Sequence, residues 1–251
     1  MSRKEWWESF FRGAWLDVQK GRDTAEIVDP AAGFIELALA LEPGGRVLDV
    51  PCGEGRLSRA LARKGYQLSG LDITGSLLTQ ARKQAMVEKL DMEFKLGDMR
   101  KIPWRNRFHG AFCWWGSFGY FDDAGNLAFL KSVHRTLKPG GRFLLDGHCA
   151  ETLFPSFEER QWVEEGSTTA LLENHYDAST GRVEMDWTLI KKGRRSRRHS
   201  SIRIYTLKEL SELAWEAGFS DVHAFGGLSG EAFELGAPRL LLLAEKAENA
   251  R

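Results

Sequence analysis

The chain has 251 residues, of which 43% are hydrophobic and 28% are charged, and this balance is ordinary for a soluble globular protein with one large domain. Its 35 Lys and Arg residues equal its 35 Asp and Glu residues, so net charge gives no reason to expect a nucleic-acid or membrane partner. No apolar run could span a bilayer, and the charged, aromatic first residues lack a signal-peptide core, so we expect a cytoplasmic protein. Cys52, Cys113 and Cys149 lie too far apart for a disulfide framework or a metal pattern, and no metal is expected.

Aromatic side chains crowd the first predicted helix. Within residues 1–29 they recur at helical spacing among charged residues, as Trp6, Trp7, Phe10, Phe11 and Trp15. This spacing predicts an amphipathic helix that packs on the body of the protein or covers its active site as a lid. The next helix is predicted to begin at Asp29-Pro30, because proline is favoured at the first helical position, and to stop at Pro43-Gly44-Gly45.

From residue 46 to residue 148 short apolar strands alternate with helical segments. Strands are predicted over residues 46–50, 66–72, 92–96, 108–115 and 142–148, with helices over residues 56–64, 75–89 and 124–137. After a capped helix over residues 206–217, strands over residues 219–225 and 239–246 bring the sheet to seven. The alternation predicts an α/β fold with a doubly wound, mostly parallel sheet, whose ligands bind beyond the carboxyl ends of the strands.

Residues 150–205 interrupt this alternation. Strands are predicted over residues 168–176, 182–191 and 199–205, and turns over residues 179–181 and 192–194 separate them. The segment is small and its ends rejoin the sheet, so it predicts an antiparallel insertion that covers the active site. We therefore expect a single domain over residues 1–251 that includes the insertion and the N-terminal helix.

The loop after the first strand carries the most informative motif. The apolar strand ends at Asp49, and the loop passes through Gly53 and Gly55 into a helix. The glycines let a ligand lie against bare backbone. The acid matters because a carboxylate repels a pyrophosphate but attracts an ammonium or sulfonium group. A nicotinamide dinucleotide stays the rival ligand, since Gly53-x-Gly55-x-x-Ser58 partly matches its fingerprint.

Four motifs in order resemble those of the class I S-adenosylmethionine-dependent methyltransferases. They are Asp49-x-x-Cys52-Gly53-x-Gly55, Leu71-Asp72, Gly97-Asp98-Met99 and Leu137-Lys138-Pro139-Gly140-Gly141. The resemblance covers residues 30–148 well and residues 206–247 less closely, and it departs at Pro51, where many relatives carry glycine. It implies a Rossmann-like fold, S-adenosylmethionine as cofactor and methyl transfer by in-line displacement.

The resemblance also implies how the cofactor is held. Asp49 is expected to face the methionine ammonium, Asp72 to accept from both ribose hydroxyls, and Asp98 to accept from the adenine amino group, with Ile73 and Met99 packed on the ring. The residues expected to bind the cofactor are Asp49, Pro51, Cys52, Gly53, Gly55, Arg56, Leu57, Asp72, Ile73, Asp98, Met99 and Trp114.

In this family the donor methyl meets its acceptor after the fourth strand. Relatives that methylate DNA bases or glutamine nitrogen carry an Asn/Asp-Pro-Pro-aromatic signature there, whereas this chain has residues 115–118 as Trp-Gly-Ser-Phe, which favours a small-molecule acceptor. His148, at the end of the fifth strand, is the first candidate for a catalytic base or an orienting group, and Tyr205 is the second. Arg203 and Tyr205 share one face of a predicted strand, which either binds the acceptor or covers the main sheet. The candidate substrate-binding residues are Trp15, Trp115, Ser117, Tyr120, His175, Arg203 and Tyr205.

The basic run from Lys191 to His199 is interpreted as a solvated hairpin, since charge at a strand edge protects it from aggregation. The sequence therefore predicts a methyltransferase acting on a nitrogen or oxygen atom of a small molecule. Two alternatives stay open. One is an RNA or protein methyltransferase that docks through the basic run, and the other is a catalytically silent S-adenosylmethionine-binding protein. We expect a monomer or a homodimer without a membrane or nucleic-acid partner.

Overall fold

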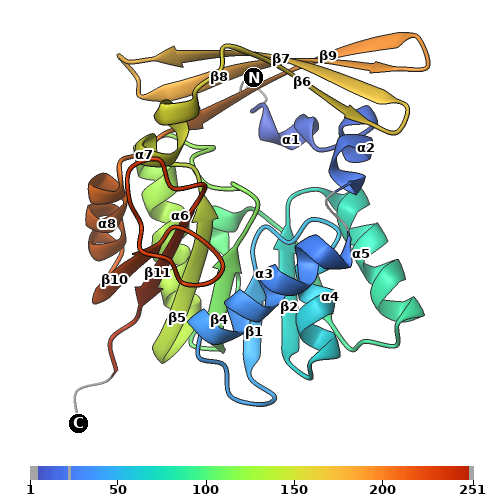
Figure 1. Ribbon diagram of the computed structural model, residues 1–251. Coiled ribbons are helices and arrows are strands. Elements are labelled where there is room, and N and C mark those ends of the chain that lie inside the picture. The colour runs from blue at the N-terminus through green and yellow to red at the C-terminus, as the bar shows by residue number, and fades with distance from the viewer. Residues whose placement is uncertain (1–4, 22–23, 249–251) are drawn as a thin grey trace.

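The computed structural model describes residues 5–21 and 24–248 and confirms the predicted doubly wound sheet (Figure 1). Its strands are β1 (Arg46–Asp49), β2 (Gln67–Asp72), β3 (Glu93–Leu96), β4 (Phe108–Cys113), β5 (Leu137–Gly147), β10 (Asp221–Phe225) and β11 (Leu240–Glu245). They are ordered β10-β11-β5-β4-β1-β2-β3, and only the pairs that involve β11 are antiparallel. The strand order reverses between β1 and β4, where sheets of this kind bind ligands.

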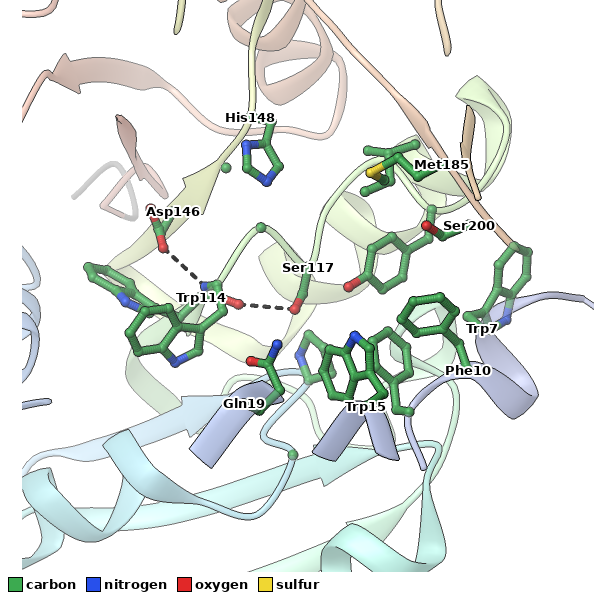
Figure 2. Close-up of a pocket in the computed structure, with 18 of the residues that line it drawn as sticks. Trp7, Phe10, Trp15, Gln19, Trp114, Ser117, Asp146, His148, Met185 and Ser200 are labelled. Atoms are coloured by element: carbon green, nitrogen blue, oxygen red, sulfur yellow. Dashed lines mark hydrogen bonds between the residues drawn. The ribbon is translucent and has the colours of Figure 1, made fainter. Parts of the chain in front are cut away.

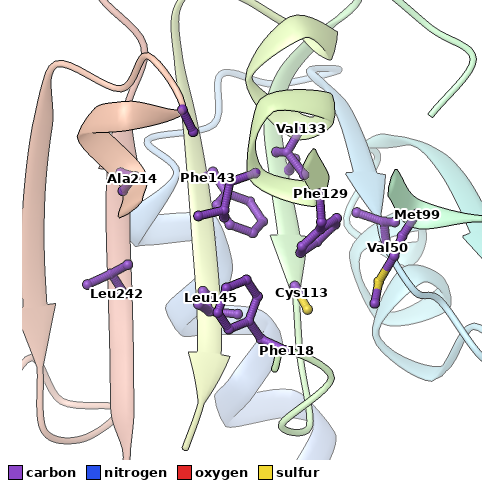
Figure 3. Close-up of a cluster of buried hydrophobic side chains, with 14 of the residues drawn as sticks. Val50, Met99, Cys113, Phe118, Phe129, Val133, Phe143, Leu145, Ala214 and Leu242 are labelled. Atoms are coloured by element: carbon purple, nitrogen blue, oxygen red, sulfur yellow. The ribbon is translucent and has the colours of Figure 1, made fainter. Parts of the chain in front are cut away.

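Helices cover both faces of this sheet. They are α3 (Ala25–Ala38), α4 (Arg56–Arg63), α5 (Gly75–Val87), α6 (Asp123–Thr136) and α8 (Leu207–Glu216). Residues in the strands alternate between two cores: Leu144 packs with residues of α3 and α4, whereas Phe143 and Leu145 pack with residues of α6 and α8. Figure 3 shows Phe129 and Val133 of α6 beside Phe143. The period of two along β5 therefore fixes the sheet between its helical layers.

A second sheet faces the main one across a gap (Figure 1). Its strands are β6 (Arg160–Glu165), β7 (Thr168–Asp177), β8 (Arg182–Lys191) and β9 (Arg194–Arg203), and all neighbours are antiparallel. Shorter elements are α1 (Trp7–Phe10), α2 (Ala14–Lys20) and α7 (Ala150–Leu153), with 3-10 turns η1 (Met99–Lys101) and η2 (Phe154–Ser156). The N-terminal aromatic helices, α1 and α2, lie between the two sheets. The predicted antiparallel insertion is thus present.

Two helix predictions were wrong. The predicted N-terminal helix is two short helices, because the chain leaves helical geometry at Phe11 and Gly13, and residues 1–4 and 22–23 of the predicted segment lie outside the described residues. The next helix begins at Ala25 rather than at Asp29-Pro30. Pro30 cannot donate a hydrogen bond to the carbonyl of Glu26. Because Glu26 is an exposed residue in the first turn, water can satisfy that carbonyl, and the helix continues through the proline.

The insertion has one strand more than predicted. Strand β6 reads as polar in sequence and forms because it pairs with β7, with Trp162 opposite Leu171. Strand β9 begins at Arg194, five residues before the predicted start. The tight turn at Lys192-Gly193 returns the chain at once, so the arginines that follow continue the ladder with β8.

Candidate functional site

A cavity of about 770 Å³ lies between the two sheets. It is lined by the carboxyl ends of β1, β2, β4 and β5, by the N-terminal aromatic helices and by one face of the four-stranded sheet. We call this face, which carries Leu172, Met185, Trp187 and Ser200, the inner face. Figure 2 shows side chains of the N-terminal aromatic helices, of β5, of the segment after β4 and of the inner face around one space. A single cavity therefore joins the predicted cofactor residues to the insertion.

The glycine loop after β1 is held by the acid at the end of β2. The Gly53 N–H donates to Asp72 Oδ2 at 2.8 Å, and the Thr74 N–H donates to Oδ1 at 2.7 Å. Burial raises the pKa of Asp72, and these two hydrogen bonds oppose that shift. Gly53 and Gly55 both have positive φ, and Gly55 leads directly into α4. The carboxylate keeps lone pairs for further donors, which fits a ribose diol.

Asp49, at the end of β1, is a buried acid with only 4% of its surface exposed. Burial raises its pKa to about 8, the Ser58 hydroxyl that donates to its Oδ2 at 2.5 Å opposes the shift, and the charge of Asp72 adds to it. The positive charge of Arg56 also lowers this pKa, but Asp49 forms no salt bridge among the described residues. A positively charged ligand group would therefore stabilise the ionised carboxylate.

Asp98 differs from the other two acids because it has a full cationic partner. Arg100 donates from Nη2 to Oδ2 at 2.6 Å, and the Arg100 backbone N–H donates to Oδ1 at 2.8 Å. Burial raises the pKa of Asp98, but the hydrogen bonds from Arg100 outweigh it and hold the pKa below its usual value. The same guanidinium lies 4.2 Å from the ring centre of Phe121 and 5.9 Å from that of Trp7. One cation thus connects the expected adenine acid to α1.

The donor set fits S-adenosylmethionine. Three carboxylates lie at successive strand ends beside a bare loop, and the most buried of them, Asp49, forms no salt bridge with any residue in 5–21 and 24–248. The predicted cofactor residues that line the cavity are Asp49, Pro51, Cys52, Gly53, Arg56, Leu57, Asp72, Ile73, Asp98, Met99 and Trp114. Gly55 is the exception, because its backbone packs under the loop, where an added Cβ would meet Phe94 at 3.4 Å.

The turn after β4 places His148 at the cavity. Trp115 and Gly116 both have positive φ, and the Trp115 N–H donates to Asp146 Oδ2 at 3.0 Å. His148 is exposed toward the cavity and its ring lies directly against Gly116, where a Cβ would come within 2.6 Å of Nε2. Ser117 donates to the Trp114 carbonyl at 3.0 Å (Figure 2). The left-handed turn therefore makes room for the histidine.

Five of the sequence-predicted acceptor residues come together at the cavity: Trp15, Trp115, Ser117, Tyr120 and His148. Three others, Tyr205, Arg203 and His175, do not line it. The Tyr205 hydroxyl donates to Asp123 at 2.6 Å and accepts from Asn126 at 2.9 Å. Arg203 pairs with Glu209 at 3.1 Å and lies over the Tyr205 ring at 4.3 Å, so these two residues do share a face, which contacts α6 and α8 rather than the cavity. His175 is exposed on the outer face of β7.

Sequence analysis did not name several residues that line the cavity. Met185 and Trp187 of β8 were missed, although acidic residues alternate with them along the strand, a period-two signal that marks an inner face. Asp146 and Arg239 were missed as well, and they form an ion pair at 3.5 Å. Nothing in the sequence pattern singles these two out, because their contact joins β5 to the loop before β11.

The basic run has two kinds of residue. Lys191 pairs with Asp17 of α2, and Arg198 donates to the backbone carbonyls of Ser9 and Phe10. Arg194, Arg195 and Arg197 are exposed. The two engaged cations therefore attach the N-terminal aromatic helices to the four-stranded sheet, a role that sequence analysis did not anticipate.

Over residues 5–21 and 24–248, no helix combines the length and apolar composition of a membrane crossing. The same residues hold no group of three or more His, Cys, Asp or Glu side chains that could bind a metal ion.

Comparisons with known proteins agree with this geometry. Residues 47–141 match the family model described as a methyltransferase domain. A dTDP-3-amino-3,4,6-trideoxy-alpha-D-glucopyranose N,N-dimethyltransferase from Streptomyces venezuelae is 26% identical over 233 residues, which cover 87% of this chain and 93% of the relative. A ubiquinone biosynthesis O-methyltransferase from Xanthomonas campestris pv. campestris (strain B100) is 28% identical over 134 residues, 52% of this chain and 54% of that one. The crystal structure of a S-adenosylmethionine-dependent methyltransferase from Clostridium acetobutylicum ATCC 824 shares the fold, with a TM-score of 0.79 at 18% identity over 93% of this chain and 97% of that chain.

Proposed function

The chain is a class I S-adenosylmethionine-dependent methyltransferase, and we propose that it methylates a nitrogen or oxygen atom of a small molecule. The observation that carries this proposal is the cavity of about 770 Å³, which runs from the three strand-end acids to the inner face of the four-stranded sheet. Its volume lies in the upper half of the range for small-molecule sites, roughly 300–1,000 Å³, and therefore suits a cofactor together with a small acceptor.

In this proposal the three acids hold the cofactor by its polar groups. S-adenosylmethionine, when bound, supplies a methyl group on a positively charged sulfur. Asp72 accepts from the ribose hydroxyls, Asp98 from the adenine amino group, and Asp49 faces the methionine ammonium. The support is that all three carboxylates line the cavity and that Asp49 is buried and forms no salt bridge among the described residues, where Arg56 acts on it only through its charge. The rival dinucleotide would bring its pyrophosphate to the same acid.

On the acceptor side, we assign His148 the task of orienting the acceptor and receiving its proton. A lone pair on the acceptor nitrogen or oxygen forms the new bond to the methyl carbon as the bond from that carbon to sulfur breaks. The proton of the acceptor passes to His148 or to water, depending on when it is lost. The position of His148 at the end of β5, against Gly116, supports this role.

The N-terminal aromatic helices are assigned the exclusion of water. Trp6 lies 4.8 Å from Tyr120 and Phe11 lies 5.0 Å from Trp15, measured between ring centres. Burial raises the pKa of Tyr120 well above its usual value, so this hydroxyl stays protonated and serves as a polar contact rather than a base. A closed aromatic wall also favours a cationic methyl donor, because aromatic faces attract cations within about 6 Å.

Calorimetric titration with S-adenosylmethionine, S-adenosylhomocysteine and NADH tests the cofactor contacts first. Micromolar binding of the two sulfur compounds without NADH is expected. Formation of S-adenosylhomocysteine is then measured across a panel of small amines and phenols, with RNA and protein acceptors beside them. Turnover on RNA or protein alone, or on none of the panel, would contradict the proposal.

Two variants test the histidine. His148→Ala is expected to lower kcat by about a hundredfold, the lower end of the usual range for a general base, while S-adenosylhomocysteine affinity stays unchanged. His148→Asn keeps a hydrogen-bonding side chain, so partial recovery of kcat would indicate orientation and no recovery would indicate proton transfer. Normal turnover of both variants would exclude His148 from the mechanism.

A further inference from the structure

Aromatic rings of the N-terminal aromatic helices, of Tyr120 and of the inner face form one wall of the cavity. Phe10 of α1 lies 5.6 Å from Trp15 of α2 and 5.7 Å from Trp187 of β8, between ring centres. Phe11 stacks on Tyr120 at 5.9 Å with an angle of 29° between their planes. Each ring is held by another, with Phe10 edge to face against both tryptophans, so the rings are fixed in place before any acceptor binds. Such walls gain most from a planar partner that can stack or meet them edge to face.

Cations on the cavity wall are few, and those present are engaged. Among the described residues that line the cavity, seven carry a carboxylate and two carry a guanidinium. Arg56 donates to the Gln19 carbonyl at 3.2 Å and lies over the Trp115 ring. Arg239 pairs with Asp146 and lies over the Trp114 ring at 5.7 Å. An anionic acceptor would therefore lose its hydration in a site with excess negative charge and no cation to spare.

The exposed arginines of the basic run do not change the excess of carboxylates over cations on the cavity wall. Arg194, Arg195 and Arg197 lie outside the residues that line the cavity, and Lys191 and Arg198 are engaged with the N-terminal aromatic helices. The Streptomyces venezuelae relative is named for a dTDP-linked sugar, which carries phosphate. Among the described residues, none that lines this cavity has a cation available to neutralise such a phosphate.

We propose that the acceptor is an uncharged planar aromatic compound with a nucleophilic nitrogen or oxygen, and that the cavity rejects phosphorylated and carboxylated compounds. This inference rests on the proposed methyltransferase function and names the substrate class of the same site. The aromatic wall binds the ring, and Ser117 and His148 lie at the same cavity to meet its polar atom.

The test compares three probes that share a naphthalene ring and differ in charge, with dTDP added as a phosphorylated probe. The protein is saturated with S-adenosylhomocysteine and titrated calorimetrically with 2-naphthol, 1-naphthylamine, 2-naphthoate and dTDP. The two uncharged probes are expected to bind at least about tenfold more tightly than 2-naphthoate, since an unpaired buried charge costs more than 1.4 kcal/mol. Binding of dTDP is expected to be undetectable. Equal or tighter binding of 2-naphthoate or dTDP, or no binding of the uncharged probes, overturns the proposal.

Variants separate ring stacking from charge. Trp187→Leu is expected to weaken 2-naphthol binding about tenfold. Its matched control, Trp162→Leu, removes a tryptophan that is 74% exposed on the outer face of the same sheet and is expected to change nothing. Met185→Lys places a cation on the inner face and is expected to reverse the order of 2-naphthol and 2-naphthoate. An unchanged order in that variant counts against the charge argument.

The cofactor measurement distinguishes two kinds of failure. If S-adenosylhomocysteine binds and the probe order is reversed in the unmodified protein, the methyltransferase function stands and the acceptor class is wrong. If S-adenosylhomocysteine does not bind, the proposed function fails, and the acceptor class fails with it.

Discussion

Cofactor binding should release a proton from Asp49. Burial raises the pKa of this carboxyl to about 8 in the ligand-free protein, so roughly one molecule in ten carries it ionised at pH 7. An ammonium placed beside it favours the ionised form and returns the pKa toward its ordinary range. Binding at pH 7 should then release about 0.9 proton for each cofactor bound.

The same linkage sets the pH dependence of affinity. Because only the ionised carboxylate binds the ammonium well, affinity should rise as pH rises through the raised pKa. The slope is about tenfold per pH unit well below pH 8 and flattens above it, which gives about fiftyfold between pH 6 and pH 8. Asp49→Asn mimics the protonated carboxyl. At pH 8 this variant should therefore bind the cofactor more weakly than the wild type, and its affinity should lack the pH dependence that comes from Asp49.

Calorimetry with S-adenosylhomocysteine measures both quantities. Titrations at pH 6, 7 and 8 in two buffers with different ionisation enthalpies give the affinity and the number of protons released. The ligand has its own ammonium, so the comparison of wild type with Asp49→Asn isolates the carboxyl. Equal pH slopes in the two proteins would refute the assignment of Asp49 to the ammonium.

Three further changes test the site. Asp72→Ala should lower S-adenosylhomocysteine affinity by about tenfold or more, because the ribose and the Gly53 N–H both lose their acceptor, as calorimetry can measure. Arg198→Ala should free the N-terminal aromatic helices, so limited proteolysis should cut within residues 5–21 faster and kcat should fall, whereas Arg197→Ala should change neither. Gly116→Ala should lower kcat about tenfold or more with cofactor affinity retained, because its Cβ would collide with the His148 ring.

Each of these has a clear contrary outcome. Full cofactor affinity in Asp72→Ala would disprove the ribose contact. The same proteolysis pattern for both arginine variants would mean that the basic run does not hold the helices. Unchanged kcat in Gly116→Ala would show that activity does not depend on the position of the His148 ring against Gly116.

The cofactor half of the cavity could be predicted because its signals are local. Asp49 and Asp72 end β1 and β2, Asp98 follows β3 after one glycine, and parallel strands bring their carboxyl ends to one edge. Their positions therefore follow from strand order alone. The sequence does not show which of the three acids forms an ion pair. Arg100 reaches Asp98 through a 3-10 turn, and such a short turn leaves no periodic pattern of residues to predict it from.

The acceptor half could be predicted only in part, because its signals depend on packing between distant segments. Alternation shows that Arg203 and Tyr205 share a face, but not that this face covers Asp123 and α6 rather than the cavity. Strand β6 has no alternation of its own and exists through its pairing with β7. The role of Arg198 depends on the carbonyls of Phe10 and Ser9, 188 and 189 residues earlier in the chain.

Different segments of the chain form the cofactor side and much of the acceptor side of the cavity, and this separation has a consequence for evolution. The cofactor acids lie within residues 47–141, the segment that matches the methyltransferase domain, whereas the aromatic helices and the four-stranded sheet lie outside it. Selection can therefore change the aromatic helices and the inner face, which make up much of the acceptor side, while the cofactor acids are left intact, and only the acceptor residues Trp115, Ser117 and Tyr120 lie in the matched segment. Exchange of residues 5–21 together with residues 150–205 between homologous enzymes should transfer the acceptor preference. Exchange of either segment alone should disrupt the contact between Arg198 and α1.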